Sequence, residues 1–236
     1  MRALILAAGI GSRLHPLTNN VPKCLVAAGE KPLIQHQIDA LRSCGVEDIV
    51  LVVGYQGPQV RERLGSSVRY IENQAFRTTN SIFSLYLARE ELNTDLVLFN
   101  CDILFHKSVL RRLLDAPFAN AVAVDSRTEL VAYEMNVTTD ADQRITRISK
   151  SLDPTDATAQ SMQLAKFDAH GAASVRSEVE LLIEGGHENT FPTSAYGKLI
   201  EANCLHAVEA GDLPWTEIDS LNDYEKAMGK VLPLLR

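Results

Sequence analysis

Unbroken apolar runs alternate with helical patterns along the first half of the chain. The runs Arg2–Ala7, Asp48–Val53 and Leu96–Asn100 are too short for helices and predict strands that are buried on both faces. Residues 32–44 carry apolar side chains at helical spacing and are followed by Gly45, a common helix terminator. Strands that are separated by helices in this way favour a mostly parallel sheet with helices on both faces.

The same patterns predict the remaining elements. Further helices are expected at residues 58–64, 80–92, 107–114, 174–183, 194–203 and 220–231, and further strands at residues 68–71, 121–124 and 162–167. Residues 130–137 and 144–149 alternate between apolar and polar positions, which predicts an antiparallel hairpin closed by a polar turn at residues 139–143. Residues 151–160 are expected to form a loop, and residues 209–215 a turn.

The predicted fold class is therefore α/β. It is a Rossmann-like, mostly parallel sheet with helices on both faces and a small antiparallel hairpin layer. Because the sequence has no internal repeat and no clear linker, we expect one domain over residues 1–236.

Composition and charge narrow the class of partner. The 236 residues carry a net charge of −7 and no lysine or arginine tract, so a surface that coats nucleic acid is not expected. The cysteines are scattered without a C-x-x-C pair, which disfavours a disulfide framework or a zinc site. The apolar run at the N-terminus is too short for a signal peptide, and no stretch is long enough to span a bilayer. We therefore expect a cytoplasmic protein with no nucleic-acid or membrane partner.

A glycine-bearing loop with two cations follows the first predicted strand. Gly9 and Gly11 leave backbone N–H groups free to surround phosphate oxygens. Arg13 can clamp phosphates through two hydrogen bonds, and Lys23 adds a mobile point charge. Leu14 stands where a dinucleotide motif has its third glycine, and no P-loop motif is present, so an NAD or FAD protein is disfavoured. A surface loop with incidental cations is the alternative, but long loops in compact domains are usually functional.

Carboxylates occur at two places where a metal ion would meet this loop. Asp102 follows a buried strand, and in such sheets ligands bind at the carboxyl ends of the strands. Glu217 and Asp219 are two residues apart, so they share one face of an extended segment, although they also suit the start of the last helix. Separated carboxylates beside a phosphate site are the ligands that Mg²⁺ prefers. Asn73 and Asn80 also end or begin elements here, for which local capping is a sufficient explanation.

The opening loop resembles the signature of a known enzyme superfamily. AAGIGSRLHPLTNNVPKCL matches every fixed position of the pattern G-x-G-[ST]-R-[LM]-x-P-L-T-x-x-x-P-K. This pattern is typical of the nucleotidyltransferases that join a nucleoside triphosphate to a small phosphate and release pyrophosphate. The resemblance continues through KPLIQHQI, NQAFRTTNSIFSLYLA, CDILF and WTEIDSLNDYEKA, and so covers nearly the whole chain. NSIFSLYLA and WTEID are similar to the branch of phosphocholine and 2-aminoethylphosphonate cytidylyltransferases.

The resemblance implies the nucleotide-diphospho-sugar transferase fold and a role for each matched residue. Residues 1–125 are then the nucleotide-binding half, and residues 126–236, with the C-terminal helix, the acceptor-binding half. Arg13, on the β- and γ-phosphates, and Lys23, on the α-phosphate, are the implied catalytic residues. Asp102, Asp219 and Glu217 are the implied Mg²⁺ ligands. The implied nucleotide-binding residues are Leu6, Ala7, Ala8, Gly9, Gly11, Ser12, Arg13, Lys23, Asn73, Asn80 and Ser81.

The implied function is a Mg²⁺-dependent transfer of CMP from CTP to a small phosphate or phosphonate with release of pyrophosphate. A quaternary ammonium prefers an aromatic cage, yet residues 126–137 offer only Tyr133, and Trp215 is the sole tryptophan. Glu129 or Glu134 would instead suit a primary ammonium, as on 2-aminoethylphosphonate.

Several alternatives stay open at this stage. Sugar 1-phosphate or inositol 1-phosphate is the alternative acceptor, and another nucleoside triphosphate is the alternative donor. A catalytically inactive nucleotide-binding regulatory module is the alternative of another class. Joint retention of the two loop cations and the aspartates favours an enzyme. The resemblance also leaves a homodimer open.

Overall fold

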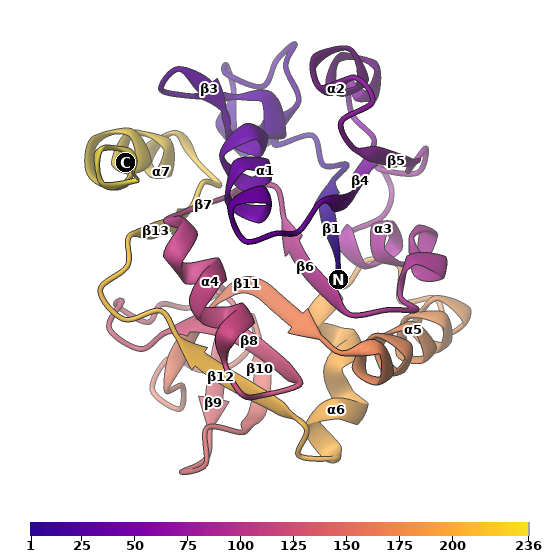
Figure 1. Cartoon of the computed structure of the whole chain (residues 1–236), viewed down its shortest axis with the longest axis vertical. Coiled ribbons are helices and arrows are strands. Elements are labelled where there is room, and N and C mark those ends of the chain that lie inside the picture. The colour runs from indigo at the N-terminus through magenta and orange to yellow at the C-terminus, as the bar shows by residue number, and fades with distance from the viewer. Residues whose placement is uncertain (236) are drawn as a thin grey trace.

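A computed structural model describes residues 1–235 (Figure 1). Within them, nine strands form one sheet in which β10-β9-β11-β6-β1-β4-β5 are successive neighbours, while β8 pairs with β11 and β12. The strands of this sheet are β1 (Arg2–Ala7), β4 (Asp48–Val53), β5 (Arg69–Glu72), β6 (Leu96–Asn100), β8 (Asn120–Asp125), β9 (Asn136–Thr139), β10 (Ile145–Ser149), β11 (Ala159–Phe167) and β12 (Leu205–Glu209).

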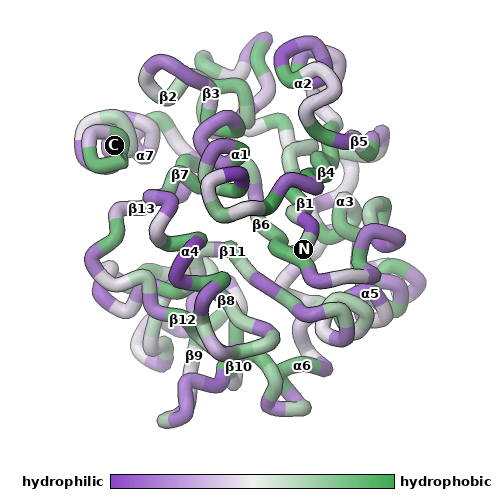
Figure 2. Tube along the Cα trace, viewed as in Figure 1, coloured by the Kyte–Doolittle hydropathy of each residue, from purple (hydrophilic) through white to green (hydrophobic). Residues whose placement is uncertain are grey.

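The half of the sheet formed by β6, β1, β4 and β5 is parallel, as predicted. Strand β1 lies between β4 and β6 and is parallel to both, and β4 is parallel to β5. Successive side chains of β1 enter two different cores, because Ile5 packs in one hydrophobic cluster and Leu6 in the other. This double burial explains the unbroken apolar runs in the sequence, and Figure 2 shows hydrophobic residues gathered on these central strands.

Helices cover both faces of the sheet. The cluster on one face includes residues of α1 (Leu33–Ser43), α2 (Gly57–Leu64) and α4 (Lys107–Asp115). The cluster on the other face includes residues of α3 (Ser81–Leu87) and α5 (Ala169–Glu184).

Two predicted helices differ from the structure. The predicted helix at residues 80–92 is too long, because α3 ends at Leu87 and a short 3-10 helix follows. The predicted helix at residues 194–203 is likewise a 3-10 helix, Pro192–Tyr196, followed by α6 (Gly197–Glu201).

The second half of the chain adds the antiparallel layer. Strand β11 is antiparallel to β6, β8 and β9, and β9 forms the expected hairpin with β10. The predicted strand at residues 130–137 is wrong for residues 130–135, which have no regular structure. The Asn136 side chain donates hydrogen bonds to the carbonyls of Val131 and Leu152 at 3.0 and 3.3 Å, which satisfies these groups without a strand partner. Strand β12, parallel to β8, was not predicted.

A short two-stranded sheet brings the end of the chain back to its middle. Strand β13 (Trp215–Glu217) pairs antiparallel with β7 (Ile103–Phe105), and neither was predicted. Ser220 begins α7 (Leu221–Lys226) with a capping box, and the helix continues as a π-helix over Ala227–Val231. A third small sheet, β2 (Ala27–Ala28) with β3 (Lys31–Pro32), precedes α1. No helix of the described residues is long and apolar enough to cross a membrane.

Candidate active site

The opening loop folds back on itself at Gly11. This residue has a φ of 68°, a left-handed conformation that only glycine adopts easily, and a Cβ here would lie 3.1 Å from Cβ of Lys23. The Thr18 hydroxyl donates a 2.7 Å hydrogen bond to the Gly11 carbonyl. Leu14, which replaces the third glycine of a dinucleotide motif, is fully buried in one cluster with Ile218. Because Leu14 packs there, the loop is held against the segment that carries Asp219.

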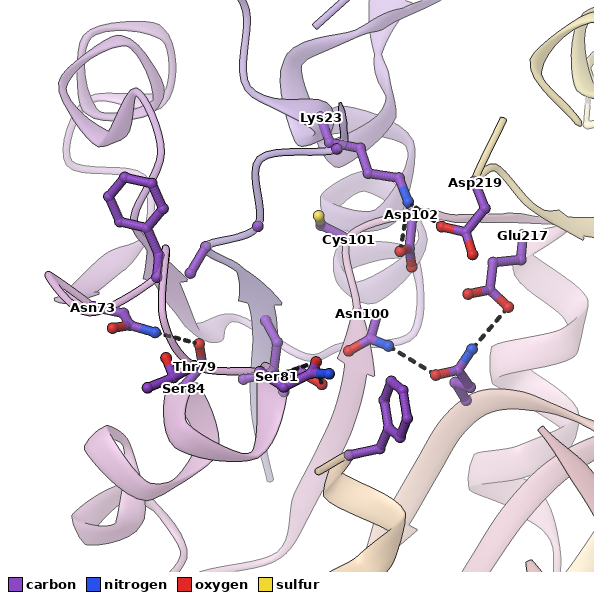
Figure 3. A pocket seen from close by; sticks show the side chains of 18 of the residues that line it. Lys23, Asn73, Thr79, Ser81, Ser84, Asn100, Cys101, Asp102, Glu217 and Asp219 are labelled. Atoms are coloured by element: carbon purple, nitrogen blue, oxygen red, sulfur yellow. Dashed lines mark hydrogen bonds and ion pairs between the residues drawn. The ribbon is translucent and has the colours of Figure 1, made fainter. Parts of the chain in front are cut away.

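Two loop cations meet two carboxylates. The Lys23 Nζ lies 2.8 Å from Oδ2 of Asp102 and 2.6 Å from Oδ1 of Asp219 (Figure 3). Arg13 donates to Oδ2 of Asp219 at 2.8 Å. Burial lowers the pKa of Lys23, but Asp102 and Asp219 raise it by more, so the ammonium stays charged. Burial likewise raises the pKa of Asp219, while Lys23 and Arg13 lower it by more, so this carboxylate stays ionised.

Three carboxylates converge beside these cations. Oxygen atoms of Asp102, Glu217 and Asp219 lie within 4.8 Å of one another. Burial, with the nearby charges of Asp102 and Asp219, raises the pKa of Glu217 to about 8. Asp102 Oδ1 is buried and has no hydrogen-bond partner among the described residues. A hard divalent cation bound by these carboxylates would supply the interaction that this oxygen lacks, so the three residues fit a Mg²⁺ ion.

The loop and the carboxylates line one cavity of about 300 Å³. All the predicted nucleotide-binding residues except Ala7 lie in its wall. The Ala7 side chain instead packs in the hydrophobic core with Val53. Asn73 donates to the Ser84 hydroxyl at 3.0 Å, and the Asn80 side chain accepts from the backbone of Ser81 at 2.7 Å, so both amides also have local partners.

The cavity wall contains residues that sequence reasoning missed. They are Phe76, Thr79, Ser84, Asn100, Cys101, Lys150, Gln163 and Phe191. Lys150 directly follows β10 and makes no ion pair among the described residues. Its Nζ lies 5.2 Å from the ring centre of Phe191. Its place at the end of an alternating strand was a visible signal, but the sequence does not say which strand ends meet.

A second cavity of about 540 Å³ adjoins the first, because Glu217 and Asp219 line both. It contains three of the predicted acceptor residues, Glu129, Glu134 and Trp215. The fourth, Tyr133, does not line it: the residue is 83% exposed and has a φ of 69°.

The charge of this second cavity is mainly negative. Its wall contains Asp125 and Asp223 in addition to the glutamates, and its cations are Arg127 and Lys226. Burial raises the pKa of Glu134. Trp215 donates its indole N–H to Asp125 at 2.8 Å, which fixes the ring against the cavity wall.

The Rossmann-like sheet, the glycine-bearing strand-end loop and the facing carboxylates are features of the nucleotidyltransferase class. The chain belongs to the MobA-like NTP transferase domain family, whose sequence model matches residues 3–170. The predicted resemblance is thereby confirmed.

Two of the similar curated proteins are named cytidylyltransferases, and a third is named a CMP-phosphonate synthase. The choline-phosphate cytidylyltransferase of Streptococcus pneumoniae is 38% identical over 55% of this chain and 57% of its own length. The CMP-5'-(3-aminopropyl)phosphonate synthase of Streptomyces rubellomurinus is 30% identical over 96% of this chain, which spans only 38% of that relative. The CTP:phosphoglutamine cytidylyltransferase of Campylobacter jejuni is 31% identical over 98% of this chain and 100% of its own length.

The fold is also that of a solved relative. The CTP:phosphocholine cytidylyltransferase from Streptococcus pneumoniae, LicC, superimposes with a TM-score of 0.81 at 28% sequence identity. The match covers 96% of this chain and 97% of the other, so it includes both the parallel strands and the antiparallel layer.

Proposed function

We propose that the chain is a Mg²⁺-dependent cytidylyltransferase that transfers CMP from CTP to a small phosphate or phosphonate and releases pyrophosphate. The observation that supports this most strongly is the meeting of Lys23 and Arg13 with Asp102 and Asp219 at the wall of one cavity. The two cytidylyltransferase relatives and the CMP-phosphonate synthase support the choice of CTP as donor.

We assign the triphosphate to the opening loop. Arg13 would bind the β- and γ-phosphates, and its side chain is 69% exposed and so has room to turn toward a ligand. Lys23 would bind the α-phosphate. Both cations have carboxylate partners in the structure, so phosphate binding requires them to exchange these partners.

Asp102, Glu217 and Asp219 are the side chains that would hold the metal ion. When bound, Mg²⁺ would offset negative charge on the phosphates and keep the attacking and leaving oxygens in line. That charge matters, because repulsion between two unit charges 4 Å apart is on the order of 4 kcal/mol at an effective dielectric of about 20.

The reaction we propose is a direct displacement. An acceptor oxygen forms a bond to the α-phosphorus, and the bond from the α-phosphorus to the α,β-bridging oxygen breaks, so pyrophosphate leaves with that oxygen. The acceptor needs no general base, because its second pKa of about 6 leaves it mostly dianionic at neutral pH. We assign its phosphate to Lys150, a cavity cation with no ion-pair partner among residues 1–235.

The second cavity favours an acceptor with a cationic group. Glu129, Glu134 and Asp125 are in its wall, and carboxylates suit a primary ammonium. Trp215 is its one tryptophan, and a full aromatic cage for a quaternary ammonium is not present in that wall. An aminoalkyl phosphonate or phosphate is therefore preferred over phosphocholine.

A matrix of substrates tests the proposal. CTP, UTP, GTP, ATP and dTTP are each combined with 2-aminoethylphosphonate, phosphocholine, inositol 1-phosphate and sugar 1-phosphates, and released pyrophosphate is measured. The proposal predicts release with CTP and an amine-bearing acceptor. Release only from UTP or dTTP with a sugar phosphate would assign the chain to the other branch.

A further inference from the structure

Gln163 has an unusual backbone for a residue inside a strand. It lies in β11 with a φ of 54°, in the left-handed region that non-glycine residues seldom adopt. The pairing of β11 with β8 shifts register between Ser161 and Ala165, so Gln163 is on a bulge. The buried Ser161 hydroxyl accepts the Gln163 backbone N–H at 3.0 Å, which supports this conformation locally.

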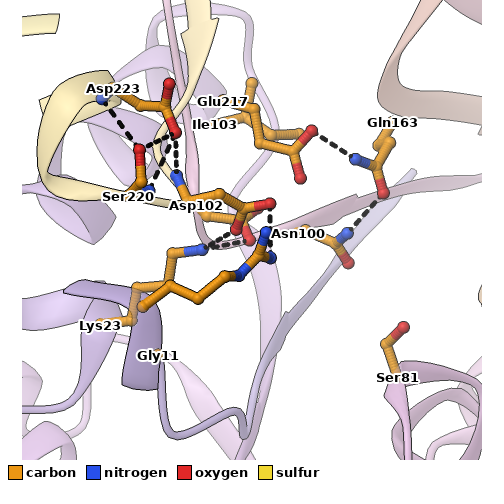
Figure 4. A network of polar contacts seen from close by, with 12 residues as sticks. Gly11, Lys23, Ser81, Asn100, Asp102, Ile103, Gln163, Glu217, Ser220 and Asp223 are labelled. Atoms are coloured by element: carbon orange, nitrogen blue, oxygen red, sulfur yellow. Dashed lines mark hydrogen bonds and ion pairs between the residues drawn. The ribbon is translucent and has the colours of Figure 1, made fainter. Parts of the chain in front are cut away.

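The bulge directs the Gln163 side chain into the nucleotide cavity, where both ends of its amide have partners (Figure 4). Its oxygen accepts from Nδ2 of Asn100 at 2.9 Å, and its nitrogen donates to Oε2 of Glu217 at 2.8 Å. The Gln163 side chain therefore links the Asn100 amide to the Glu217 carboxyl group.

The pairing of β13 with β7 places the backbone of Glu217 opposite Ile103, and Gln163 holds its side chain. Strand β13 pairs only with β7, and Gln163 is the one hydrogen-bond donor to the Glu217 carboxylate among the described residues. Asp102 and Asp219 lie close enough to repel that carboxylate. Asn100 is two residues before Asp102, so the chain of amides ties Glu217 to the strand end that presents Asp102.

We propose that Gln163 is a positioning residue that holds Glu217 beside Asp102 and Asp219 for metal binding, and that the strained bulge exists to aim its side chain. This inference rests on the metal-dependent transfer proposed above. Strained backbone persists where the surroundings enforce it, and such positions cluster at functional sites.

Two substitutions test the role from different directions. Gln163→Gly relieves the backbone strain but removes the amide, and Gln163→Met keeps the volume but cannot hydrogen-bond Glu217. Gln143→Gly is the matched control, because Gln143 has a φ of 64° in an exposed turn outside the cavity. Binding of Mn²⁺ to each purified protein is measured from the free-ion signal by electron paramagnetic resonance, and the melting temperature is measured in EDTA.

We expect both Gln163 variants to bind Mn²⁺ about 10–100-fold more weakly than the wild type, the usual effect of losing a hydrogen-bond partner of a metal ligand. The Gln143→Gly protein should bind as the wild type does. Wild-type affinity, within about twofold, in both folded Gln163 variants would overturn the inference and leave cytidylyl transfer intact. Failure of the wild type itself to bind Mn²⁺ would overturn both the metal assignment and this inference.

Discussion

Replacing Lys23 by methionine should destabilise the folded protein, because two buried carboxylates lose a counterion. The Lys23 ammonium is the buried counterion of Asp102 and Asp219, at 2.8 and 2.6 Å. Methionine keeps most of the side-chain volume and removes the charge, so the three converging carboxylates lose their closest cation. Removing one partner of a buried ion pair costs about 3–5 kcal/mol. For a protein of this size, that corresponds to a fall in melting temperature of roughly 6–20 °C.

The effect of Mg²⁺ should then differ between the two proteins. In the wild type, a metal ion must displace the Lys23 ammonium from Asp102 and Asp219. In Lys23→Met it meets carboxylates whose remaining cation is the exposed Arg13, so Mg²⁺ without nucleotide should bind more tightly and raise the melting temperature by a larger amount. Turnover should nevertheless fall by about 10²–10³-fold, because the charge that stabilises the transferred phosphate is lost.

Thermal unfolding followed by circular dichroism, in EDTA and in Mg²⁺, measures both effects. Lys31→Met is the matched control, because Lys31 pairs with Asp39 at the surface, where the two side chains are 44% and 42% exposed. An exposed pair of this kind contributes at most about 1 kcal/mol. A loss of stability no larger for Lys23→Met than for this control, or an equal Mg²⁺ effect on variant and wild type, would refute the reasoning.

Three further predictions concern the metal site, the loop and acid stability. Asp102→Asn should reduce Mg²⁺-dependent pyrophosphate release by roughly 10³-fold without unfolding the protein, and near-normal turnover would contradict the metal assignment. Gly54→Ala should cost about 1–3 kcal/mol in urea unfolding, because its Cβ would stand 2.8 Å from a carbonyl oxygen of the opening loop; an unchanged midpoint would contradict it. Burial raises the pKa of Asp48, but arginines lower it by more, and the hydrogen bond from Arg69 lowers that of Glu91. The two carboxylates therefore stabilise the fold at pH values above their ordinary pKa values of 3.8 and 4.5, and this stabilisation is lost as the pH falls through their lower pKa values in the folded protein. Arg69→Ala should therefore make the free energy of unfolding depend less on pH in this acidic range.

The parallel half of the fold was predictable because its signals are local. Strands β1, β4 and β6 are buried on both faces, so each is apolar at nearly every position. Strands β7 and β13 span three residues each and exist because they pair with each other across more than a hundred positions of sequence. The residues of β7 alone do not indicate that β13 is its partner, and those of β13 do not indicate β7.

The site residues also divide into those with a local sequence signal and those that depend on long-range structure. Arg13 and Lys23 lie in one continuous motif, and Asp102 ends a strand whose carboxyl edge was predicted, so they were accessible to sequence reasoning. Gln163 and Lys150 enter the cavity through a bulge in β11 and through the end of β10. A bulge reverses which side of a strand a residue faces, and alternation alone does not reveal it.

The most direct test of the central claim follows the oxygen atoms of the transfer. The acceptor is labelled with ¹⁸O in its phosphate or phosphonate group, CTP and Mg²⁺ are added, and the products are examined by ³¹P NMR and mass spectrometry. Attack of the acceptor oxygen on the α-phosphorus predicts that the CMP-linked product retains all the label, with one labelled oxygen in the new bridge, and that pyrophosphate has none. Label in pyrophosphate, or release of CMP without transfer to the acceptor, would contradict the account.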